Sequence, residues 1–470
     1  MRMAKQLLFL FSAIFLFTSC GDTNKKTCGS AWVGGEIVNP KKDFVIVSHN
    51  RNIIDTIPLD EKNFFTYQIN QVDPGIYFFE NGEFQAFFLE PGDSLMFRVN
   101  TIEFDESLTY SGKGAQKNNF LMDLFLLNEG VDNIMMSLYD LPPNKFEDKM
   151  DSIHEQRNTL LEQFLKKNKS SKGYQEMVKA AIDYGIYSKK ELYISGNSKK
   201  MVYDESVVIP TEFYEFRKNI ELGNASLRNY YPYFRCLGYY MDNLAFENYK
   251  GEAPFDRDSY IHNVHKVQLI DSLITHDSLK NKLLRNSVGR YLINGSNAAQ
   301  EADMLATFQE LSTNVKDKRE ITQLAEATMK LVPGKDIPNV LLLTTENTAK
   351  DLHTIIQKPT VLYFWSSNSI KHYRNIHIRA SELRSKFPEF DFIGINLDKH
   401  FKKWKRMVQS AGYPSQFEYQ FENYDDAEKK LLVNTINKSM IVDANGKILD
   451  GNTNIFSVGI EQELLGYINR

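Results

Sequence analysis

The sequence predicts an all-β domain, then an all-α domain, and then an α/β domain at the end of the chain. Three observations support this order. Short β-rich runs separated by turn residues extend to about residue 115, apolar residues at steps of three and four follow up to residue 332, and a continuous apolar run, Thr360–Trp365, then leads into a helical pattern. A chain of 470 residues is long enough for several domains of ordinary size.

The composition is that of a globular protein with a nearly balanced charge. Hydrophobic residues make up 42% of the chain and charged residues 25%, and the net charge is -4. This balance gives no reason to expect a nucleic acid or an acidic membrane surface as partner. No cofactor signature and no metal-ligand cluster stand out, so peptides, proteins and small ligands remain as candidate partners.

Residues 1–20 have the pattern of a signal peptide. Two basic residues precede the apolar run at residues 7–17, which is too short to span a bilayer, and small residues lead to Cys20. This ending resembles the bacterial lipobox, and an ordinary secretory signal is the alternative. The resemblance implies that Cys20 is lipidated and anchors the chain to a bacterial membrane, facing the periplasm or the cell surface. Residues 21–30 are predicted to be a flexible tether.

Residues 31–115 are predicted to form an antiparallel sandwich or small barrel, because six β-rich runs are separated by turn signals. The runs lie at residues 44–47, 53–54, 64–67, 75–79, 84–89 and 95–99. Asn81-Gly82 and the Pro-Gly-Asp at residues 91–93 are the clearest turns. The FLEPGD motif at residues 88–93 and the YSGKGA motif at residues 110–115 resemble the N-terminal β-domain of exported lipoproteins, domain of unknown function 4369.

Residues 116–332 are predicted to form an irregular helical bundle, since amphipathic patterns recur without the regular period of a repeat protein. The predicted helices cover residues 146–164, 174–193, 213–222, 230–249, 260–274, 279–293, 302–311 and 321–331.

Two groups in this bundle have alternative interpretations. His262 and His265 have a helical spacing that could hold a metal, but no third ligand is indicated nearby, so a solvated helix face is expected. An aromatic group could be a ligand-stacking surface, although core and interdomain packing is the expected role. Its members are Tyr230, Tyr231, Tyr233, Phe234, Tyr239 and Tyr240.

Residues 333–470 resemble the thioredoxin-like proteins of the TlpA type. The family pattern K-P-x-V-L-x-F-W-A-x-W-C-x-x-C-R is matched at Lys358, Pro359, Val361, Leu362, Phe364 and Trp365. Residues 433–448 lie over a second pattern, V-x-x-I-P-T-x-F-L-I-D-x-x-G-K-I, with a hairpin turn at residues 443–446. The resemblance implies a thioredoxin fold, which the family uses for thiol-disulfide exchange.

The catalytic positions of that family are altered in this chain. Ser369 and His372 stand where the family has its two redox cysteines, and Asn437 stands at its cis-proline. Dithiol exchange needs two sulfurs, one of them with a lowered pKa. A cis bond before a residue other than proline costs about 3 to 4 kcal/mol, so the bond before Asn437 is expected to be trans.

The sequence therefore favours an anchored extracytoplasmic lipoprotein with a redox-inactive crevice that binds a peptide, a protein or a small ligand. The crevice residues are predicted to be Trp365, Ser369, His372 and Asn437. One alternative is a residual redox role through Cys28 or Cys236, whose pairing the sequence leaves open. Another is a hydrolase in which Ser369, His372 and Asn437 act as nucleophile, base and orienting amide. Against that alternative, Ser369 is expected to cap a helix and His372 to face solvent.

Overall fold

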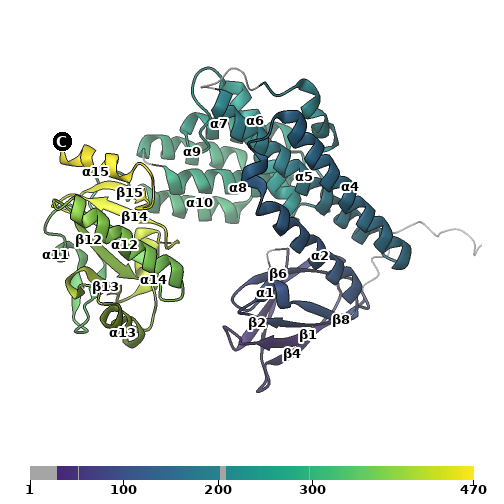
Figure 1. Ribbon diagram of the computed structural model, residues 1–470, viewed down its shortest axis with the longest axis horizontal. Coiled ribbons are helices and arrows are strands. Elements are labelled where there is room, and N and C mark those ends of the chain that lie inside the picture. The colour runs from purple at the N-terminus through teal and green to yellow at the C-terminus, as the bar shows by residue number, and fades with distance from the viewer. Residues whose placement is uncertain (1–28, 51, 202–207, 296, 434, 470) are drawn as a thin grey trace, which may run out of the picture. The chain divides into compact units, whose positions relative to one another are not determined.

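A computed structural model describes residues 29–50, 52–201, 208–295, 297–433 and 435–469 (Figure 1). The predicted signal peptide, most of the predicted tether, Cys20 and Cys28 lie outside these residues. Within them, no helix combines the length and the apolar character needed to cross a membrane. The chain separates into two compact units, residues 1–138 with 155–179 and residues 139–154 with 180–470.

The β-domain is a sandwich of two four-stranded sheets (Figure 1). Of the two predicted architectures, the sandwich is therefore the one that forms. One sheet has the order β4-β1-β7-β8 and the other β3-β2-β5-β6. The core lies between them, where Phe79 of one sheet stacks on Phe97 of the other with ring centroids 4.1 Å apart. The strands are β1 (Ala31–Val38), β2 (Phe44–His49), β3 (Asn52–Pro58), β4 (Phe64–Ile69), β5 (Gly75–Glu80), β6 (Phe84–Leu89), β7 (Ser94–Asn100) and β8 (Thr109–Lys113).

The expectation of a purely antiparallel domain is wrong at one strand pair. β1 and β7 are parallel, whereas the other strand pairs described in this domain are antiparallel. The two strands approach closely at Gly35, where a Cβ atom would lie 2.1 Å from the Phe97 carbonyl oxygen. The predicted turns are confirmed, and Gly82 and Gly92 adopt φ of 90° and 82° in them.

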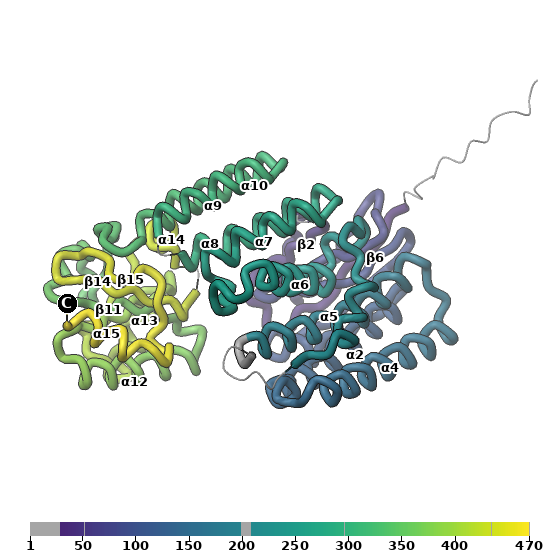
Figure 2. The backbone as a smooth tube through the Cα atoms, turned by 90° about the horizontal axis from the view of Figure 1, so that it is seen from above, coloured from purple at the N-terminus to yellow at the C-terminus, as the bar shows by residue number. Residues whose placement is uncertain are grey.

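The helical region contains long helices that pack beside their neighbours in the sequence. α6 packs on α7, α7 on α8, and α8 on α10, and Figure 2 shows α6 to α10 side by side. Side chains of Ser259, Asn297 and Asn314 cap the starts of α7, α9 and α10. The long helices are α2 (Ala115–Asp132), α4 (Pro143–Lys167), α5 (Lys172–Met201), α6 (Tyr231–Tyr249), α7 (Tyr260–Leu273), α8 (Asp277–Asn294), α9 (Ala298–Leu311) and α10 (Val315–Thr328).

Three expectations for this region need correction. Residues 211–219 form a 3-10 helix, η1, because Phe213 and Phe216 are both buried and a three-residue turn places them on one side. His262 does not face solvent but is buried between Tyr249 and Asp242. Tyr233 is a core residue, as expected, but Tyr231 is 65% exposed and lines a cavity. Two short helices precede α4, namely α1 (Phe104–Ser107), between β7 and β8 of the β-domain, and α3 (Met135–Leu138), after α2.

The C-terminal domain is the predicted thioredoxin-like α/β fold. Its seven-stranded sheet has the order β10-β9-β13-β12-β11-β14-β15. β11 is buried along its whole length and pairs in parallel with β12 and antiparallel with β14. The strands are β9 (Leu341–Leu343), β10 (Ala349–Asp351), β11 (Thr360–Trp365), β12 (Asp391–Asn396), β13 (Glu418–Phe421), β14 (Ser439–Val442) and β15 (Ile448–Thr453).

Helices cover both faces of this sheet because successive residues of β11 point to opposite sides. Val361, Tyr363 and Trp365 pack against α12, α13 and α15, and Leu362 and Phe364 pack against α11 and α14. The helices are α11 (Leu352–Ile355), α12 (Ile370–Lys386), α13 (Phe401–Ala411), α14 (Tyr424–Leu431) and α15 (Ile460–Ile468), with a short 3-10 turn η2 (Ser415–Phe417). β13 and α14 were not predicted from the sequence.

Candidate functional site

The candidate crevice lies where β11 and β12 end. β11 stops at Trp365 and α12 begins at Ile370, so Ser369 ends the loop between them and His372 lies in the first turn of the helix. In open α/β sheets, ligands bind outside the carboxyl ends of the strands, so this loop is in the expected position for a functional site.

Asp398, just after β12, holds the loop in place. Its carboxylate accepts a hydrogen bond from the Ser366 hydroxyl at 2.5 Å and from the Ser367 backbone N–H at 2.7 Å, and the Asn396 side-chain amide donates a further bond at 3.1 Å. Burial alone would raise the pKa of Asp398, but these hydrogen bonds outweigh it and lower the pKa below its ordinary value. The loop is therefore fixed by an ionised carboxylate.

Ser369 occupies the N-cap position of α12, but its side chain makes no capping hydrogen bond, contrary to expectation. His372 follows one turn later and is partly buried, so the expectation that it faces solvent is also wrong. Its ring packs edge-on against Phe456 with centroids 5.9 Å apart, and neither ring nitrogen has a hydrogen-bond partner. A hydrogen bond from Ser369 to His372, as a nucleophile and its base would make, is thus absent between these two described residues.

Asn437 is exposed and lies beside His372. Burial, and then the neighbouring His377, lower the pKa of His372, while the polar side chain of Asn437 acts in the opposite direction. Their contact nevertheless lacks the geometry of a hydrogen bond. The peptide bond before Asn437 is trans, as expected, because none of the peptide bonds described is cis.

Lys438, the next residue, is buried, and its side chain caps the C-terminal end of α14. Its ammonium group donates to the carbonyl oxygens of Leu431 at 2.8 Å and Leu432 at 3.4 Å, which a helix end otherwise leaves unpaired. Burial lowers the pKa of Lys438 to about 8. Thus the loop that carries Asn437 is also fixed by a buried charged residue.

A buried polar network lies beneath the crevice, centred on Glu418 of β13. The Glu418 carboxylate accepts hydrogen bonds from the Tyr363 hydroxyl at 3.0 Å and the Trp365 indole N–H at 3.1 Å, and lies 3.1 Å from Nε2 of His377. Gly394 makes room for it, since a Cβ there would lie 2.8 Å from the carboxylate and from the Tyr363 ring. Trp365 therefore supports the crevice from below.

The hydrogen bonds of His377 fix the orientation of its ring. Nδ1 lies 2.6 Å from the Tyr373 carbonyl oxygen, which can only accept, so Nδ1 donates to it. Nε2 faces the Glu418 carboxyl group. The ring stacks on Tyr413 at 3.7 Å, which closes the network from the other side. Burial and the neighbouring Glu418 raise the pKa of the Tyr363 hydroxyl well above its ordinary value.

Sequence reasoning missed Asp398 and Glu418. Asp398 had a usable signal, because it directly follows the predicted strand at residues 390–397 and so belongs at the carboxyl end of the sheet. Glu418 had a weaker one, because it alternates with the aromatic residues Phe417, Tyr419 and Phe421 in a strand that was not predicted.

Cysteine chemistry finds little support in the described residues. Cys236 is a free, fully buried thiol in α6. Burial raises the pKa of this thiol far above its ordinary value, which suppresses the thiolate needed for exchange. Cys28 lies outside the described residues. Among the residues that the structure describes, no group of three His, Cys, Asp or Glu side chains is arranged to hold a metal ion.

The order of the central strands and the helix that starts directly after β11 define the C-terminal domain as thioredoxin-like. Residues 357–448 match a protein family described as thioredoxin-like. No curated protein matches the chain.

Solved structures that match part of this chain include proteins described as thiol-disulfide exchange proteins. A structure described as a thiol-disulfide oxidoreductase of Bacteroides vulgatus is 17% identical, with a TM-score of 0.26, and the match covers 29% of this chain and 97% of that one. A thiol:disulfide interchange protein of a Bacteroides species is also 17% identical, with a TM-score of 0.23 and coverage of 26% and 81%. The thioredoxin domain of another Bacteroides vulgatus oxidoreductase is 14% identical, with a TM-score of 0.23 and coverage of 29% and 96%.

Proposed function

We propose that this protein is a lipid-anchored extracytoplasmic lipoprotein whose thioredoxin-like domain binds a peptide, a protein or a small ligand without catalysing thiol-disulfide exchange. The observation that carries the proposal is the first turn of α12, where Ser369 and His372 replace the two redox cysteines of the TlpA type. The sequence has cysteines only at positions 20, 28 and 236, so the domain has no thiol of its own.

The surroundings of the crevice support a binding role. Asp398 and Lys438 fix the two loops that form it, and a fixed loop loses little conformational entropy when a ligand binds. Asn368 and Asn437 are exposed, whereas the two ring nitrogens of His372 are buried. The side-chain amides of the two asparagines can donate to or accept from the backbone of a bound chain or the polar atoms of a small molecule.

Disulfide reduction decides the catalytic part of the proposal. We expect the purified protein to reduce insulin with dithiothreitol no faster than the uncatalysed rate. A clearly faster rate that persists in the Cys28→Ser/Cys236→Ser protein would overturn the non-catalytic assignment of the crevice.

Site-specific crosslinking tests the binding part. A photoreactive amino acid at Asn437 in cells should trap a defined product, whereas the same group at Lys350, exposed on strand β10 at the sheet edge, should not. Identical products from both positions, or none from either, would count against a ligand in the crevice.

The anchor is tested separately. Cys20→Ser should release the protein from membranes or block its processing. Normal cleavage together with retention on membranes in high salt would contradict lipidation at this residue.

A further inference from the structure

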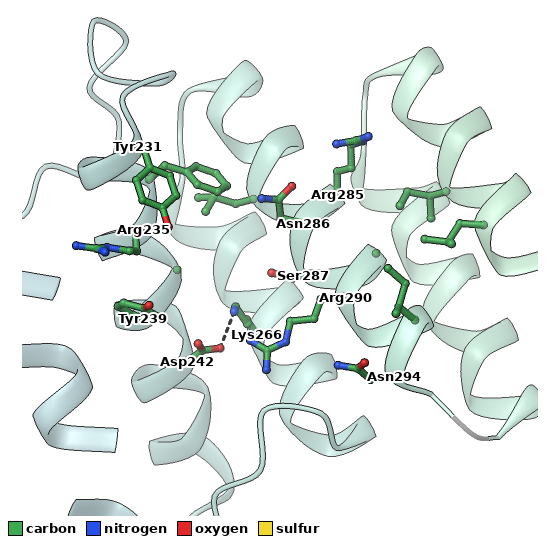
Figure 3. A pocket seen from close by; sticks show the side chains of 17 residues that line it. Tyr231, Arg235, Tyr239, Asp242, Lys266, Arg285, Asn286, Ser287, Arg290 and Asn294 are labelled. Carbon is green, nitrogen blue, oxygen red and sulfur yellow. Dashed lines mark hydrogen bonds and ion pairs between the residues drawn. The ribbon is translucent and has the colours of Figure 1, made fainter. Parts of the chain in front are cut away.

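The helical region contains a cavity of about 630 Å³, formed by α6, α7, α8 and α10 (Figure 3). This volume is in the range of pockets that bind small ligands. The cavity lies wholly within one compact unit, and none of its residues belongs to the thioredoxin-like domain.

One end of the cavity is built on a buried carboxylate, Asp242. It contacts the Lys266 ammonium group at 2.5 Å, Arg257 Nε at 3.1 Å and His262 Nε2 at 3.0 Å. Burial alone would raise the pKa of Asp242, but Lys266, His262 and Arg257 outweigh it and lower the pKa far below its ordinary value. One ionised carboxylate is therefore shared by two basic side chains, Lys266 and Arg257.

Two further cations line the cavity with little neutralisation. Arg235 has no carboxylate partner among the described residues, and its Nε is buried without a hydrogen bond. Arg290 makes a single contact with Asp258 at 3.1 Å and remains half exposed. In Figure 3, Arg290 extends from α8 toward the Lys266–Asp242 pair. By contrast, Arg285 is matched by Asp317 and Glu320.

The remainder of the lining combines hydrogen-bonding and apolar groups. Asn286 and Ser287 of α8 face the cavity between its ends (Figure 3). Leu283, Ile321 and Leu324 provide aliphatic surface, and Tyr231 adds an exposed aromatic ring. The alternative is that these charges only hold α6 against α7. That role would not require Arg235, Arg290 or this apolar wall.

We propose that this cavity binds a carboxylate that carries an apolar or aromatic group, with Arg290 and the Lys266 end receiving the carboxylate and the α8–α10 wall receiving the apolar part. A free carboxylic acid and the C-terminus of a peptide both present this chemistry. The site is independent of the thioredoxin-like crevice.

Calorimetry on the full-length purified protein tests the proposal. The first pair of probes is N-acetyl-phenylalanine and its amide, and the second is a hexapeptide ending in phenylalanine with a free or an amidated C-terminus. We expect the free acid of at least one pair to bind about tenfold more tightly than its amide, as loss of a charge-assisted contact predicts. Binding of the peptide acid alone, or of the small acid alone, identifies the source of the carboxylate.

Matched variants place the binding at the cavity. Arg290→Gln should weaken the binding of the acid about fivefold or more. Lys280→Gln should leave it unchanged, because Lys280 lies on the same helix and also has one carboxylate partner, Asp271 at 3.0 Å, but does not line the cavity. Leu324→Asp should also weaken binding, by adding a negative charge to the apolar wall.

The proposal is overturned if neither acid binds at about 5 mM, which is weaker than ordinary ligand affinities. Equal affinity for acid and amide in both pairs also overturns it. So does the same loss of affinity in Arg290→Gln and Lys280→Gln.

Discussion

The crevice of the thioredoxin-like domain and the cavity of the helical region contain similar residues but use their charges differently. In the crevice, Asp398 accepts from Ser366 and Ser367, and the charge of Lys438 is taken up by helix carbonyls. In the cavity, Asp242 is shared by two cations and Arg235 has no carboxylate partner in the described part of the chain. Charges that the protein itself satisfies stabilise a fold, whereas unmatched cations beside a cavity are available to a ligand. Substitution of these charged residues should therefore change mainly stability in the first region and mainly binding in the second.

The largest effect is expected from Glu418→Ala. It leaves the Tyr363 hydroxyl, the Trp365 indole N–H and His377 without their buried partner, which should lower the free energy of unfolding by about 3 to 5 kcal/mol. Urea unfolding measures the loss of unfolding free energy, and hydrogen exchange of the β11 amides shows whether this strand is affected. Glu422→Ala, at an exposed position just after β13, is the control and should change little. Equal effects of the two would show that the network is not structural.

Lys438 should make stability depend on pH. Its pKa falls from 10.5 to about 8 on folding, so between these values the unfolded chain binds the proton more tightly and the folded state gains stability as pH rises. Relative to Lys438→Met, the wild-type protein should gain about 3 kcal/mol from pH 8 to pH 10.5. Urea unfolding of both proteins across this range measures the difference. A constant difference would mean that Lys438 is not desolvated as described.

Asp398→Ala should have a smaller effect, because Asp398 is only partly buried. Loss of its bonds to Ser366 and Ser367 should cost about 1 to 2 kcal/mol and speed hydrogen exchange in the loop after β11. Asp398→Asn keeps an acceptor and should cost less. If the alanine variant leaves exchange of the Ser367 amide unchanged, the loop is held by something else.

Arg290→Gln should have the smallest effect on stability, below about 0.5 kcal/mol, because both members of its ion pair are about half exposed. Thermal unfolding measures it. A loss as large as that of Asp398→Ala would remove the contrast between the two regions and assign Arg290 a structural role.

The parts of the fold that sequence could predict are those in which local pattern decides the outcome. β11 was predicted because a strand buried on both faces is a continuous apolar run, and the turns at Gly82 and Gly92 because left-handed backbone favours glycine. The parallel partner of β1 was not predicted, since alternation defines the buried face of a strand but not its neighbour.

The candidate sites were harder to predict, because burial of a charge depends on distant segments. The sequence placed Ser369 and His372 together at the start of one helix, but it gave no indication of Asp398, 29 positions beyond Ser369, as the residue that fixes their loop. Likewise, His262 was interpreted as part of a solvated face, since nothing local to α7 reveals Asp242 on α6.

The position of β1 has a consequence for the order of folding. β1 precedes the other described strands of the β-domain along the chain, yet it lies inside its sheet between β4 and β7, and Trp32 pairs with Ser94. The edge of β1 that pairs with β7 therefore stays unpaired until more than half of the β-domain has been synthesised. Closing so long a loop costs conformational entropy before the strand contacts form. Among the helices α6 to α10, by contrast, α6 packs on α7 and α7 on α8, each the next helix in the chain. Formation of the sandwich is thus expected to be slower than folding of these helices, even though the sandwich precedes them in the chain.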